Sequence, residues 1–489
     1  MTTPILSSVS SSILSPHLEQ VLLQIIKGLN TSNLVINNMY NGKYVYTLNR
    51  YKDMLIDATK DLNIEKSIIE SFLLKIINAE YAPDIATRIK EIEAIPLIEQ
   101  KTPEWFKQRE TMISASDSGY FLKKCGASKA IDSLKIKVGL KSYVNSSAPP
   151  LTHGNTYEDV SRAIYESRNC VSVTEYGILS SPTTCIGASP DGVVTSCHKD
   201  TYDCKSKYGR LLEIKNPYSR EIDNTIKPEY MVQILQQQYT TGLPICDFVE
   251  TTIVDAYCNT NNSNYKPYTN LAEMLDDKLD KTNLLWQKRV KNKNIPVDNL
   301  NKFGNEKGLI VWYKKQMTET DTRNKYIMYP LMSVYDILTI EKWIVDTTSE
   351  QFKDGYRYIC TKYWRLDVYS EKTVVYDQTK FEGEYVPQLC SIWEVITNCN
   401  ELSLDGGNVA NYIEDIEKDK ESPFYNENKR KKKAKMEEMG DMGGLGGMGE
   451  MGGMERDEAS GNISPTKSKP KSNKNNNNNP DKEIIELDF

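Results

Sequence analysis

Apolar positions change their spacing along the chain, and each spacing predicts a different kind of structure. Over residues 1–100 apolar residues recur three and four positions apart, as in HLEQVLLQIIKGL and IEKSIIESFLLKIINAEY, which is typical of amphipathic helices. From 101 to 260 short apolar runs alternate with Gly, Pro and Ser turns, which indicates strands and helices around a mixed sheet. We therefore expect a helical N-terminal extension (1–100) followed by an α/β (α+β) core (101–260).

The second half of the chain predicts an extension of this core and then a tail. The segments GLIVWYKKQM, NKYIMYP and KTVVYDQ are expected to be further strands of the same sheet, and CSIWEVI indicates a helix. Residues 261–419 should therefore extend the core. From residue 420 a Met/Gly-rich repeat, a Ser/Pro/Lys stretch and a run of asparagines cannot bury enough apolar surface to fold, which predicts disorder over 420–489.

The chain of 489 residues has a formal net charge of -6, and 26% of its residues are charged. It has no apolar run of transmembrane length and no leader-like N-terminus, so we expect a soluble, intracellular protein without a membrane partner. The negative charge argues against a protein that coats nucleic acid through global electrostatics. It does not exclude a nuclease, because metal-binding carboxylates add negative charge and DNA needs only a local basic lining.

The ten cysteines are scattered, which favours reduced thiols over a disulfide framework. Cys197 and Cys204, with His198 between them, are the nearest approach to a zinc site. A fourth ligand is not evident and the separation fits no standard zinc pattern, so a solvated hairpin turn is the favoured interpretation.

Carboxylates in two neighbouring segments suggest phosphodiester hydrolysis, which needs an activated water and cations that neutralise the attacked phosphate. GASPDGVV places Asp191 at the end of a short strand before a Gly turn, and RLLEIKNP places Glu213 and Lys215 on the next strand. Side chains alternate along a strand, so Glu213 and Lys215 share one face while Leu212 and Ile214 point into the core. A hairpin would set Asp191 beside them.

This pattern predicts a metal-dependent hydrolase. Asp191 and Glu213 would bind Mg²⁺, with Mn²⁺ as the alternative ion and the Ile214 carbonyl as a further ligand, while Lys215 would orient the attacking water. An isolated E-x-K on a strand is usually a solvated charged face, so the specificity of the pattern comes from its flanks.

Three flanking segments add candidate residues. THGNTYEDVSRAIYE indicates a Gly turn opening a helix, on which Glu158 and Arg162 lie one turn apart and Ala163 and Ile164 face inward. Glu158 can reach toward the metal, although an acid near a helix N-terminus also complements the helix dipole. On EYMVQILQQQYTTG, Tyr230, Gln233 and Gln237 share one face and can hold a water or a phosphate, although a glutamine-rich helix is more often exposed.

The third flank, EWFKQRETMISASDSGYF, has the composition of an anion site. It contains Trp105, Arg109, Ser114 and Ser116 before a helix start, and guanidinium, hydroxyl and helix N-terminal N–H groups all bind phosphate. The alternative is an ordinary capped helix.

Taken in order, these blocks resemble λ exonuclease and the YqaJ-type viral recombinases, a family of the PD-(D/E)XK nuclease superfamily. The matching motifs are W-x3-R-x3-I-[ST]-A-S, G-x2-[YF]-E, S-P-D-G, L-E-[IL]-K-x-P and Y-M-x-Q with a following T-G, at Trp105 to Ser116, Gly154 to Glu158, Ser189 to Gly192, Leu212 to Pro217 and Tyr230 to Gly242. The motif-bearing part covers 101–260, with a looser similarity up to about residue 400.

The resemblance implies a site, a reaction and partners. Glu158, Asp191, Glu213 and Lys215 would form the metal and catalytic centre with Gln233 close to it, and the 5′-phosphate end of DNA would be held by Arg109, Ser116 and Ser189. The family degrades one strand of duplex DNA from its 5′ end and leaves a 3′ strand for an annealing protein, often as a ring-shaped homotrimer. An endonuclease, an RNA-directed nuclease and a catalytically silent scaffold that binds DNA ends are the alternatives.

This chain departs from the family pattern at Leu235, where the family helix often has the middle glutamine of Q-x-Q-x-Q. In the tail, KRKKKAK (Lys429 to Lys435) suggests a nuclear localisation signal, a DNA tether or a solubilising charge run. The final EIIELDF (Glu483 to Phe489) resembles the acidic tips that recruit replication partners. For a viral protein, the host nucleus or a cytoplasmic replication site is the expected location.

Overall fold

A computed structural model describes residues 16–32, 52, 55–62, 64–78, 82–96, 98, 102–141, 149–181, 185–223, 225–255, 268–276, 300–301, 306–315, 324–331 and 336–425. The chain divides into the units Met1–Arg430 and Lys431–Phe489, and the second lies wholly outside the described residues. No helix among the described residues is long and apolar enough to cross a membrane.

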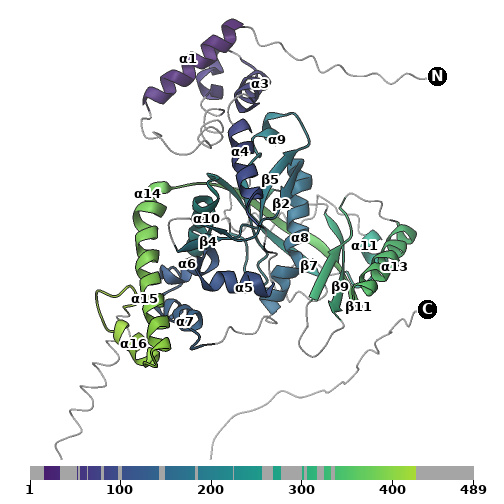
Figure 1. Ribbon diagram of the computed structural model, residues 1–489. Coiled ribbons are helices and arrows are strands. Elements are labelled where there is room, and N and C mark those ends of the chain that lie inside the picture. Colours follow the sequence, from purple (N-terminus) through teal and green to yellow (C-terminus); the bar gives the residue numbers. More distant parts are fainter. Residues whose placement is uncertain are drawn as a thin grey trace, which may run out of the picture. The chain divides into compact units, whose positions relative to one another are not determined.

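A large mixed sheet forms the centre of the first unit (Figure 1). Its strands follow the order β10-β9-β11-β7-β6-β5-β2, and β8 (Leu300–Asn301) pairs with β11 beside this path. In chain order the strands of the path are β2 (Val171–Thr174), β5 (Gly192–Cys197), β6 (Leu211–Lys215), β7 (Ile245–Asp255), β9 (Lys307–Lys315), β10 (Asn324–Met328) and β11 (Tyr356–Val375). A small second sheet joins β1 (Ile113–Ser114), β4 (Ile186–Ala188) and β3 (Leu179–Ser180).

The predicted α/β class, with a central mixed sheet flanked by helices, is confirmed. All three apolar segments predicted as later strands join the large sheet, as β9, β10 and the end of β11, and CSIWEVI lies within α15 (Val386–Leu404). β6 and β7 run parallel, with α10 (Pro228–Thr241) as their crossover, whereas β5 and β6 are antiparallel. Antiparallel strands need only a short connection, and parallel strands need a crossover that is usually a helix.

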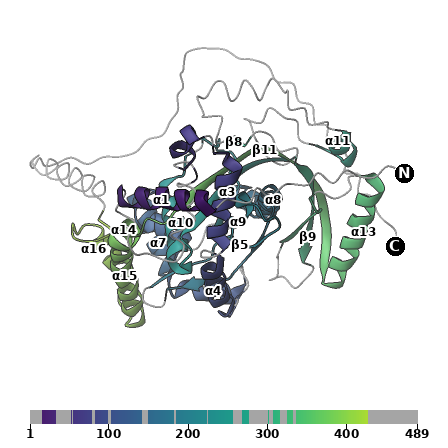
Figure 2. The same cartoon turned by 90° about the horizontal axis from the view of Figure 1, so that it is seen from above.

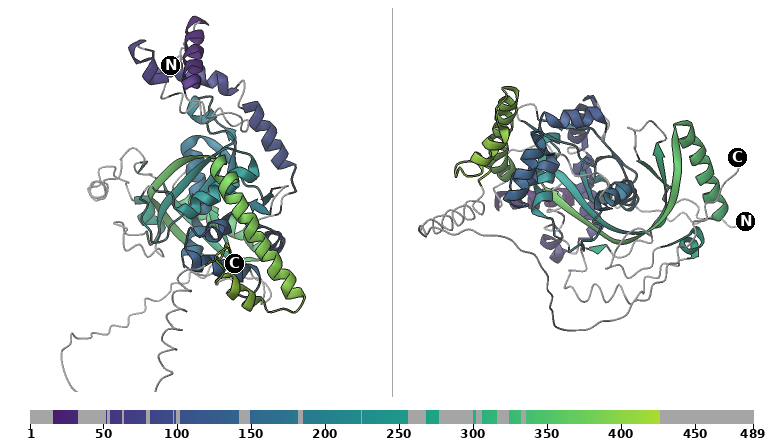
Figure 3. Two further views of the ribbon diagram at one scale, coloured as in Figure 1. Left: turned by 90° about the vertical axis from the view of Figure 1, so that its left-hand side faces the viewer. Right: turned by 90° about the horizontal axis from the view of Figure 1, so that it is seen from below.

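The long strand β11 curves, and helices cover both of its sides (Figure 2). α8 (Pro149–Asn169) lies inside the curve and α13 (Ile337–Lys353) lies outside it, as the right-hand view of Figure 3 also shows. On the inner side Tyr157 and Ile164 of α8 pack with Trp364, and on the outer side Ile340 of α13 packs with Val311. The sheet therefore separates two apolar clusters.

The N-terminal extension is helical, as predicted. It contains α1 (Pro16–Ser32), α3 (Lys66–Ile76) and α4 (Ala82–Glu93), with a short 3₁₀ turn at Lys60–Leu62. Leu22, Phe72 and Ile89 from these segments share one buried cluster with Leu211 and Phe248 of the large sheet. This continuity explains why the amphipathic pattern begins before the α/β core.

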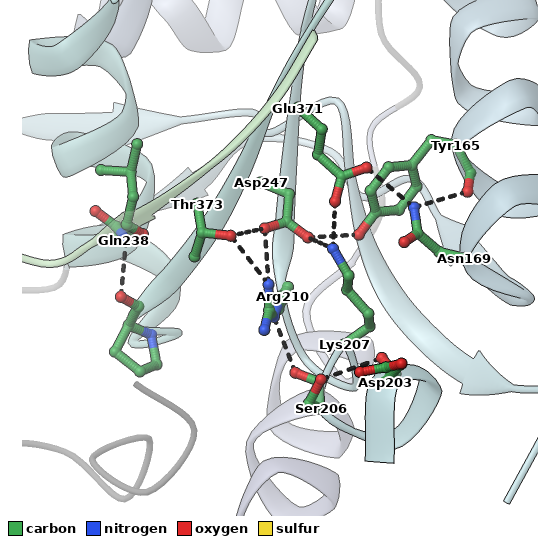
Figure 4. A network of polar contacts seen from close by, with 12 residues as sticks. Tyr165, Asn169, Asp203, Ser206, Lys207, Arg210, Gln238, Asp247, Glu371 and Thr373 are labelled. Carbon is green, nitrogen blue, oxygen red and sulfur yellow. Dashed lines mark hydrogen bonds and ion pairs between the residues drawn. The ribbon is translucent and has the colours of Figure 1, made fainter. Parts of the chain in front are cut away.

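A buried ionic network joins strands that are distant in sequence (Figure 4). Asp247 of β7 is fully buried, and its two carboxylate oxygens lie 2.9 Å from Arg210 Nη1 and 2.8 Å from Lys207 Nζ. Lys207 also pairs with Glu371 of β11, and Tyr165 of α8 donates a hydrogen bond to Asp247 at 2.8 Å. The network therefore fastens the connection between α9 (Tyr202–Lys205) and β6 to β7, β11 and α8.

The predicted start of the disordered tail at residue 420 is wrong by several residues. Phe424 is 1% exposed and packs edge-on against Phe121, with ring centroids 6.3 Å apart. It belongs to the cluster formed by α15, the π-helical turn Phe381–Tyr385 and α16 (Val409–Ile416), because aromatic burial there fixes the chain after the last helix. The rest of the predicted tail lies outside the described residues, including the basic motif at Lys429 to Lys435 and the acidic motif at Glu483 to Phe489.

Candidate active site

Asp191 lies beside β6 because β5 and β6 are paired next to it. Gly192 pairs with Leu212, and Asp191 accepts a hydrogen bond from the Ile214 N–H at 2.7 Å. The predicted juxtaposition is therefore confirmed, but Asp191 precedes β5 instead of ending a strand before a Gly turn. Gly192 is the first residue of β5. A Cβ at this position would lie 2.2 Å from Val173 Cγ1, so the close packing of β2 excludes a larger residue.

Glu213 and Lys215 lie on one face of β6, as their spacing predicts. Their side chains form an ion pair, Glu213 is fully buried and about a quarter of the Lys215 side chain is exposed. Leu212 and Ile214 point to the opposite face and enter the cluster beneath α8. The alternation of side chains along a strand is sufficient to explain this part of the site.

The acids of this centre interact with one another electrostatically. The pKa of Asp191 is raised well above its usual range, first by loss of solvation around its carboxyl group and then by the negative charges of Glu213 and Glu158. Burial would lower the pKa of Lys215, but the charges of Glu213 and Asp191 outweigh it and hold this pKa above its usual value. Lys215 is therefore a stable ammonium group at neutral pH.

Glu158 belongs to α8, whose predicted start is wrong. Gly154 does not open the helix, because α8 already begins at Pro149, and proline is favoured in a first helical turn. Arg162 pairs with Asp159 at 2.9 Å and with Glu175, which leaves Glu158 to interact with Asp191. Ile164 is buried as expected, whereas Ala163, predicted to face inward, is only half-buried.

The donor set suits a hard divalent cation. The carboxylates of Glu158, Asp191 and Glu213 and the Ile214 carbonyl are all oxygen donors, as Mg²⁺ prefers. Gln237 Oε1 is a further buried oxygen that has no hydrogen-bond partner within the described ranges. In the described part of the chain no three His, Cys, Asp or Glu side chains are grouped closely enough to hold an ion, and Glu213 is in contact with Lys215 and Gln237. The chemistry of the donors, and not an existing cluster of acids, is therefore what suits Mg²⁺.

Gln236, Gln237 and Gln238 of α10 are buried, contrary to the exposed alternative. Gln237 Nε2 donates to Glu213 Oε2 at 2.6 Å, whereas Gln233, one turn earlier, is half-buried. Gln236 donates to the carbonyls of Ile113 and Gly187 at 2.9 Å, which ties α10 to the small sheet. This structural role was missed from the sequence, because identical neighbouring residues do not reveal which of them faces the sheet.

The structure also places Tyr230 beside the site. Its ring centroid lies 5.3 Å from Lys215 Nζ and 5.7 Å from Lys227 Nζ. The shared helix face predicted for Tyr230 and Gln237 is therefore consistent with their common approach to the β6 residues.

A separate polar cluster gathers the predicted anion-binding residues. Arg109 Nη2 of α5 (Pro103–Glu110) donates to Ser114 Oγ and to Ser116 Oγ, each at 2.8 Å. Asp117 lies 3.7 Å from the same guanidinium nitrogen, and the Trp105 ring lies under the guanidinium with its centroid at 4.6 Å. The cluster precedes α6 (Ala115–Phe121).

Two further observations qualify this cluster. Ser189, which the resemblance assigns to the same phosphate site, donates to the Tyr176 carbonyl at 3.3 Å. Lys137 of α7 (Ala127–Lys137) donates to the Arg109 carbonyl at 2.5 Å, and burial lowers the pKa of this lysine. Lys137 was missed because a lysine at the end of an amphipathic helix has no distinguishing pattern.

Between Cys197 and Cys204 the exposed residues 198–201 form the solvated turn that the sequence favours over a zinc site, and the described residues contain no group of His, Cys, Asp or Glu that could hold a metal here. Cys204 is buried in the short helix α9 (Tyr202–Lys205), and Cys197 Sγ donates to the Cys204 carbonyl at 3.2 Å. His198 contacts Ser172 Oγ through Nε2 at 2.7 Å. Burial raises the pKa of the Cys197 thiol to about 12, the opposite of what a metal-binding thiolate needs.

Fold and site together define an α/β protein with an acid-rich centre at the junction of β5, β6, α8 and α10. Residues 104–244 match the model of the YqaJ-like viral recombinase domain, which confirms the family resemblance drawn from the motifs. An uncharacterized protein, R354, of Acanthamoeba polyphaga mimivirus is 29% identical over 362 residues, which are 69% of this chain and 60% of that protein. This chain therefore aligns with less than two thirds of its viral relative.

Solved structures with local similarity are those of an alkaline exonuclease. LHK-Exo in complex with dAMP is 29% identical and covers 30% of this chain and 73% of its own, with a TM-score of 0.25. The structure of LHK-Exo from Laribacter hongkongensis is 27% identical and covers 31% of this chain and 74% of its own, with the same TM-score.

Proposed function

We propose that this chain is a Mg²⁺-dependent deoxyribonuclease that degrades linear duplex DNA from the 5′ end and leaves 3′ single strands for viral DNA recombination, replication or repair. The observation that carries the proposal is the association of Asp191, Glu213 and Lys215 next to Glu158. All four residues lie within the part of the chain that matches the YqaJ-like domain. Mn²⁺ is the alternative ion.

The roles of these residues follow from their chemistry. Glu158, Asp191, Glu213 and the Ile214 carbonyl would hold Mg²⁺, which when bound neutralises charge on the attacked phosphate and makes water a better nucleophile. Lys215 is held protonated by the neighbouring acids, so it would orient the attacking water and stabilise negative charge and would not accept its proton.

The Arg109 cluster supports recognition of a DNA end. Its guanidinium and the hydroxyl groups of Ser114 and Ser116 are already mutually oriented. A terminal phosphate would have to displace Asp117, which accepts a hydrogen bond from Ser114 Oγ at 2.6 Å and lies 3.7 Å from the guanidinium. A 5′-phosphate carries more negative charge than a phosphodiester, so such a site favours an end over an internal position. This preference is what an exonuclease of the proposed polarity needs.

Digestion of end-labelled linear duplexes tests the proposal directly. With Mg²⁺ we expect loss of the 5′-labelled strand, faster on a duplex that carries a 5′-phosphate than on one with a 5′-hydroxyl, and no cleavage in chelator. Equal digestion rates for the 5′-phosphate and the 5′-hydroxyl duplex would contradict the role of Arg109. Degradation that begins at the 3′ end would contradict the proposed polarity. Cleavage of closed circles would indicate an endonuclease, cleavage of RNA an RNA-directed nuclease, and end binding without turnover a silent scaffold.

The assembly and protein partners stay predictions. Sedimentation of the full chain tests the ring-shaped homotrimer, and a pull-down with and without residues 480–489 tests recruitment of an annealing or replication protein. A monomer in the first experiment, or an unchanged pull-down in the second, would contradict the corresponding expectation.

A further inference from the structure

The outer arm of the large sheet is strongly basic. β9, β10 and residues 356–365 of β11 contain no Asp or Glu, although the whole chain has a net charge of -6. Their charged residues are Lys307, Lys314, Lys315, Lys325, Arg357, Lys362 and Arg365. A local positive region on an acidic chain attracts polyanions.

The strand register separates this arm into two faces. Trp312 pairs with Tyr326 on one side and with Cys360 on the other, and Lys314 pairs with Arg357. Directly paired residues project from the same face, and alternation adds Lys362 to that face. The opposite face is covered by α13, which packs on Leu309, Val311 and Tyr313. On the first face Lys314 and Arg357 are exposed, and Trp312 and Tyr326 are partly exposed.

Two aromatic rings on the first face are arranged as a platform. The rings of Trp312 and Tyr326 are stacked with an interplanar angle of 20° and centroids 6.0 Å apart. Lys362 Nζ lies 5.5 Å from the Trp312 centroid and 5.9 Å from that of Tyr326, and Trp312 Nε1 donates to Asn324 Oδ1 at 3.1 Å. The hydrogen bond and the cation hold the rings in place, and both aromatic side chains remain partly exposed.

The platform adjoins the helix that carries an active-site acid. Tyr326 packs against the buried cluster that includes Tyr157 of α8, and Glu158 is the next residue of the same helix. α8 therefore separates the platform from the acids by about one helix diameter, roughly 10 Å. A strand that leaves the acids could reach the rings within a few nucleotides.

We propose that Trp312, Tyr326 and Lys362 form a base-stacking platform for single-stranded DNA. Aromatic planes bordered by cations bind single strands with little sequence preference, because every base has a π face and every linkage a negative charge. The platform deepens the proposed function, on which it rests, by naming a surface for the strand that digestion leaves. It lies outside residues 104–244, so it would be a feature of the C-terminal extension.

Binding in chelator tests the platform separately from cleavage. A fluorescent oligothymidylate is titrated with the full chain as wild type, Trp312→Ala, Lys362→Ala and Lys325→Ala, in metal-free buffer at several salt concentrations. Lys325 projects from the opposite face and its substitution changes the net charge equally, so it is the matched control. We expect Trp312→Ala to weaken binding about tenfold. Lys362→Ala should weaken binding and reduce the salt slope by about 0.7.

The outcomes distinguish the platform from the nuclease. Affinity for Trp312→Ala equal to wild type, or equal losses for Lys362→Ala and Lys325→Ala, would overturn the platform even if the enzyme cuts DNA. Platform-dependent binding without Mg²⁺-dependent cleavage would support the platform as a binding surface and refute the nuclease. Trp312→Phe should restore most of the affinity if stacking is the cause, and thermal melting verifies that each variant is folded. A smaller assembly for Trp312→Ala, with unchanged affinity per protomer, would make this face an interface between copies and overturn the proposal.

Discussion

Gln237 on α10 donates a hydrogen bond from Nε2 to Glu213 Oε2 at 2.6 Å, while its own Oε1 is buried without a hydrogen-bond partner among the described residues. The Gln237 amide on α10 therefore fixes the orientation of the Glu213 carboxylate, which is fully buried on β6. Partners of this kind commonly determine the geometry of a metal ligand without being ligands themselves.

Replacement of Gln237 by leucine should lower the cleavage rate by about 10- to 100-fold, because Glu213 loses the donor that orients it. Rates at saturating DNA and a Mg²⁺ titration measure the effect, and the apparent Mg²⁺ affinity should fall with the rate. Thr240→Val on the same helix is the control, since its hydroxyl donates only to helix carbonyls in the described structure. A wild-type rate for Gln237→Leu would show that the contact is dispensable.

Lys215→Met should abolish detectable cleavage while DNA-end binding is retained, because the ammonium that faces the acids is lost. A loss of at least about 10²-fold is expected for a group that stabilises the transition state. Lys227→Met is a matched control, since Lys227 also lies against Tyr230 but not against the acids. Comparable losses in both variants would point to general electrostatics instead of a specific role.

Mg²⁺ should raise the melting temperature of the wild-type protein, by roughly 5 °C at a hundredfold excess over its Kd. Asp191→Asn should melt higher than wild type in chelator, because it removes one of three mutually repelling acids. The same variant should lose most of the Mg²⁺ shift. A melting temperature for Asp191→Asn that is unchanged in chelator and still rises with Mg²⁺ would place the ion elsewhere.

His153 predicts a pH dependence of stability with a definite sign. Burial lowers the pKa of His153 from 6.5 to about 4, so the unfolded chain binds a proton in this range and the folded chain does not. Stability should therefore fall as the pH decreases from 6.5 to 4, with a contribution from this residue of about 3 kcal/mol. Urea unfolding measured from pH 7.5 to 4 should show a smaller loss of unfolding free energy for His153→Gln than for the wild type. Parallel stability curves for the two proteins would show that His153 is not the source of the pH dependence.

Asp247→Ala should destabilise the protein by about 3–5 kcal/mol, because it leaves the buried Arg210 without its carboxylate partner and removes one of the two acids paired with Lys207. Burial would raise the pKa of Asp247, but these two cations outweigh it and lower the pKa, so the ion pairs persist at neutral pH. Asp203→Ala, which removes an exposed partner of Lys52, should cost less than about 1 kcal/mol in the same denaturation experiment. Equal costs would mean that the network contributes little.

The local part of the site could be predicted from the sequence because it depends on short-range geometry. Alternation along one strand is enough to place Glu213 and Lys215 on the same face, and the motif blocks identify Arg109 with Ser114 and Ser116. The start of α8 was misjudged because Gly154 resembles a turn residue, although Pro149 had already opened the helix.

By itself, the sequence determined the α/β class, the family motifs, the order of the candidate acids and the helical nature of the N-terminal extension. The tertiary structure alone decided that Gln237 contacts Glu213, that Asp247 gathers two cations, and that Trp312 stacks on Tyr326. The reason is physical: periodicity reports which side of an element is apolar. Contacts between elements distant in sequence depend instead on strand register and on the desolvation that packing imposes, and no short stretch of the sequence contains either.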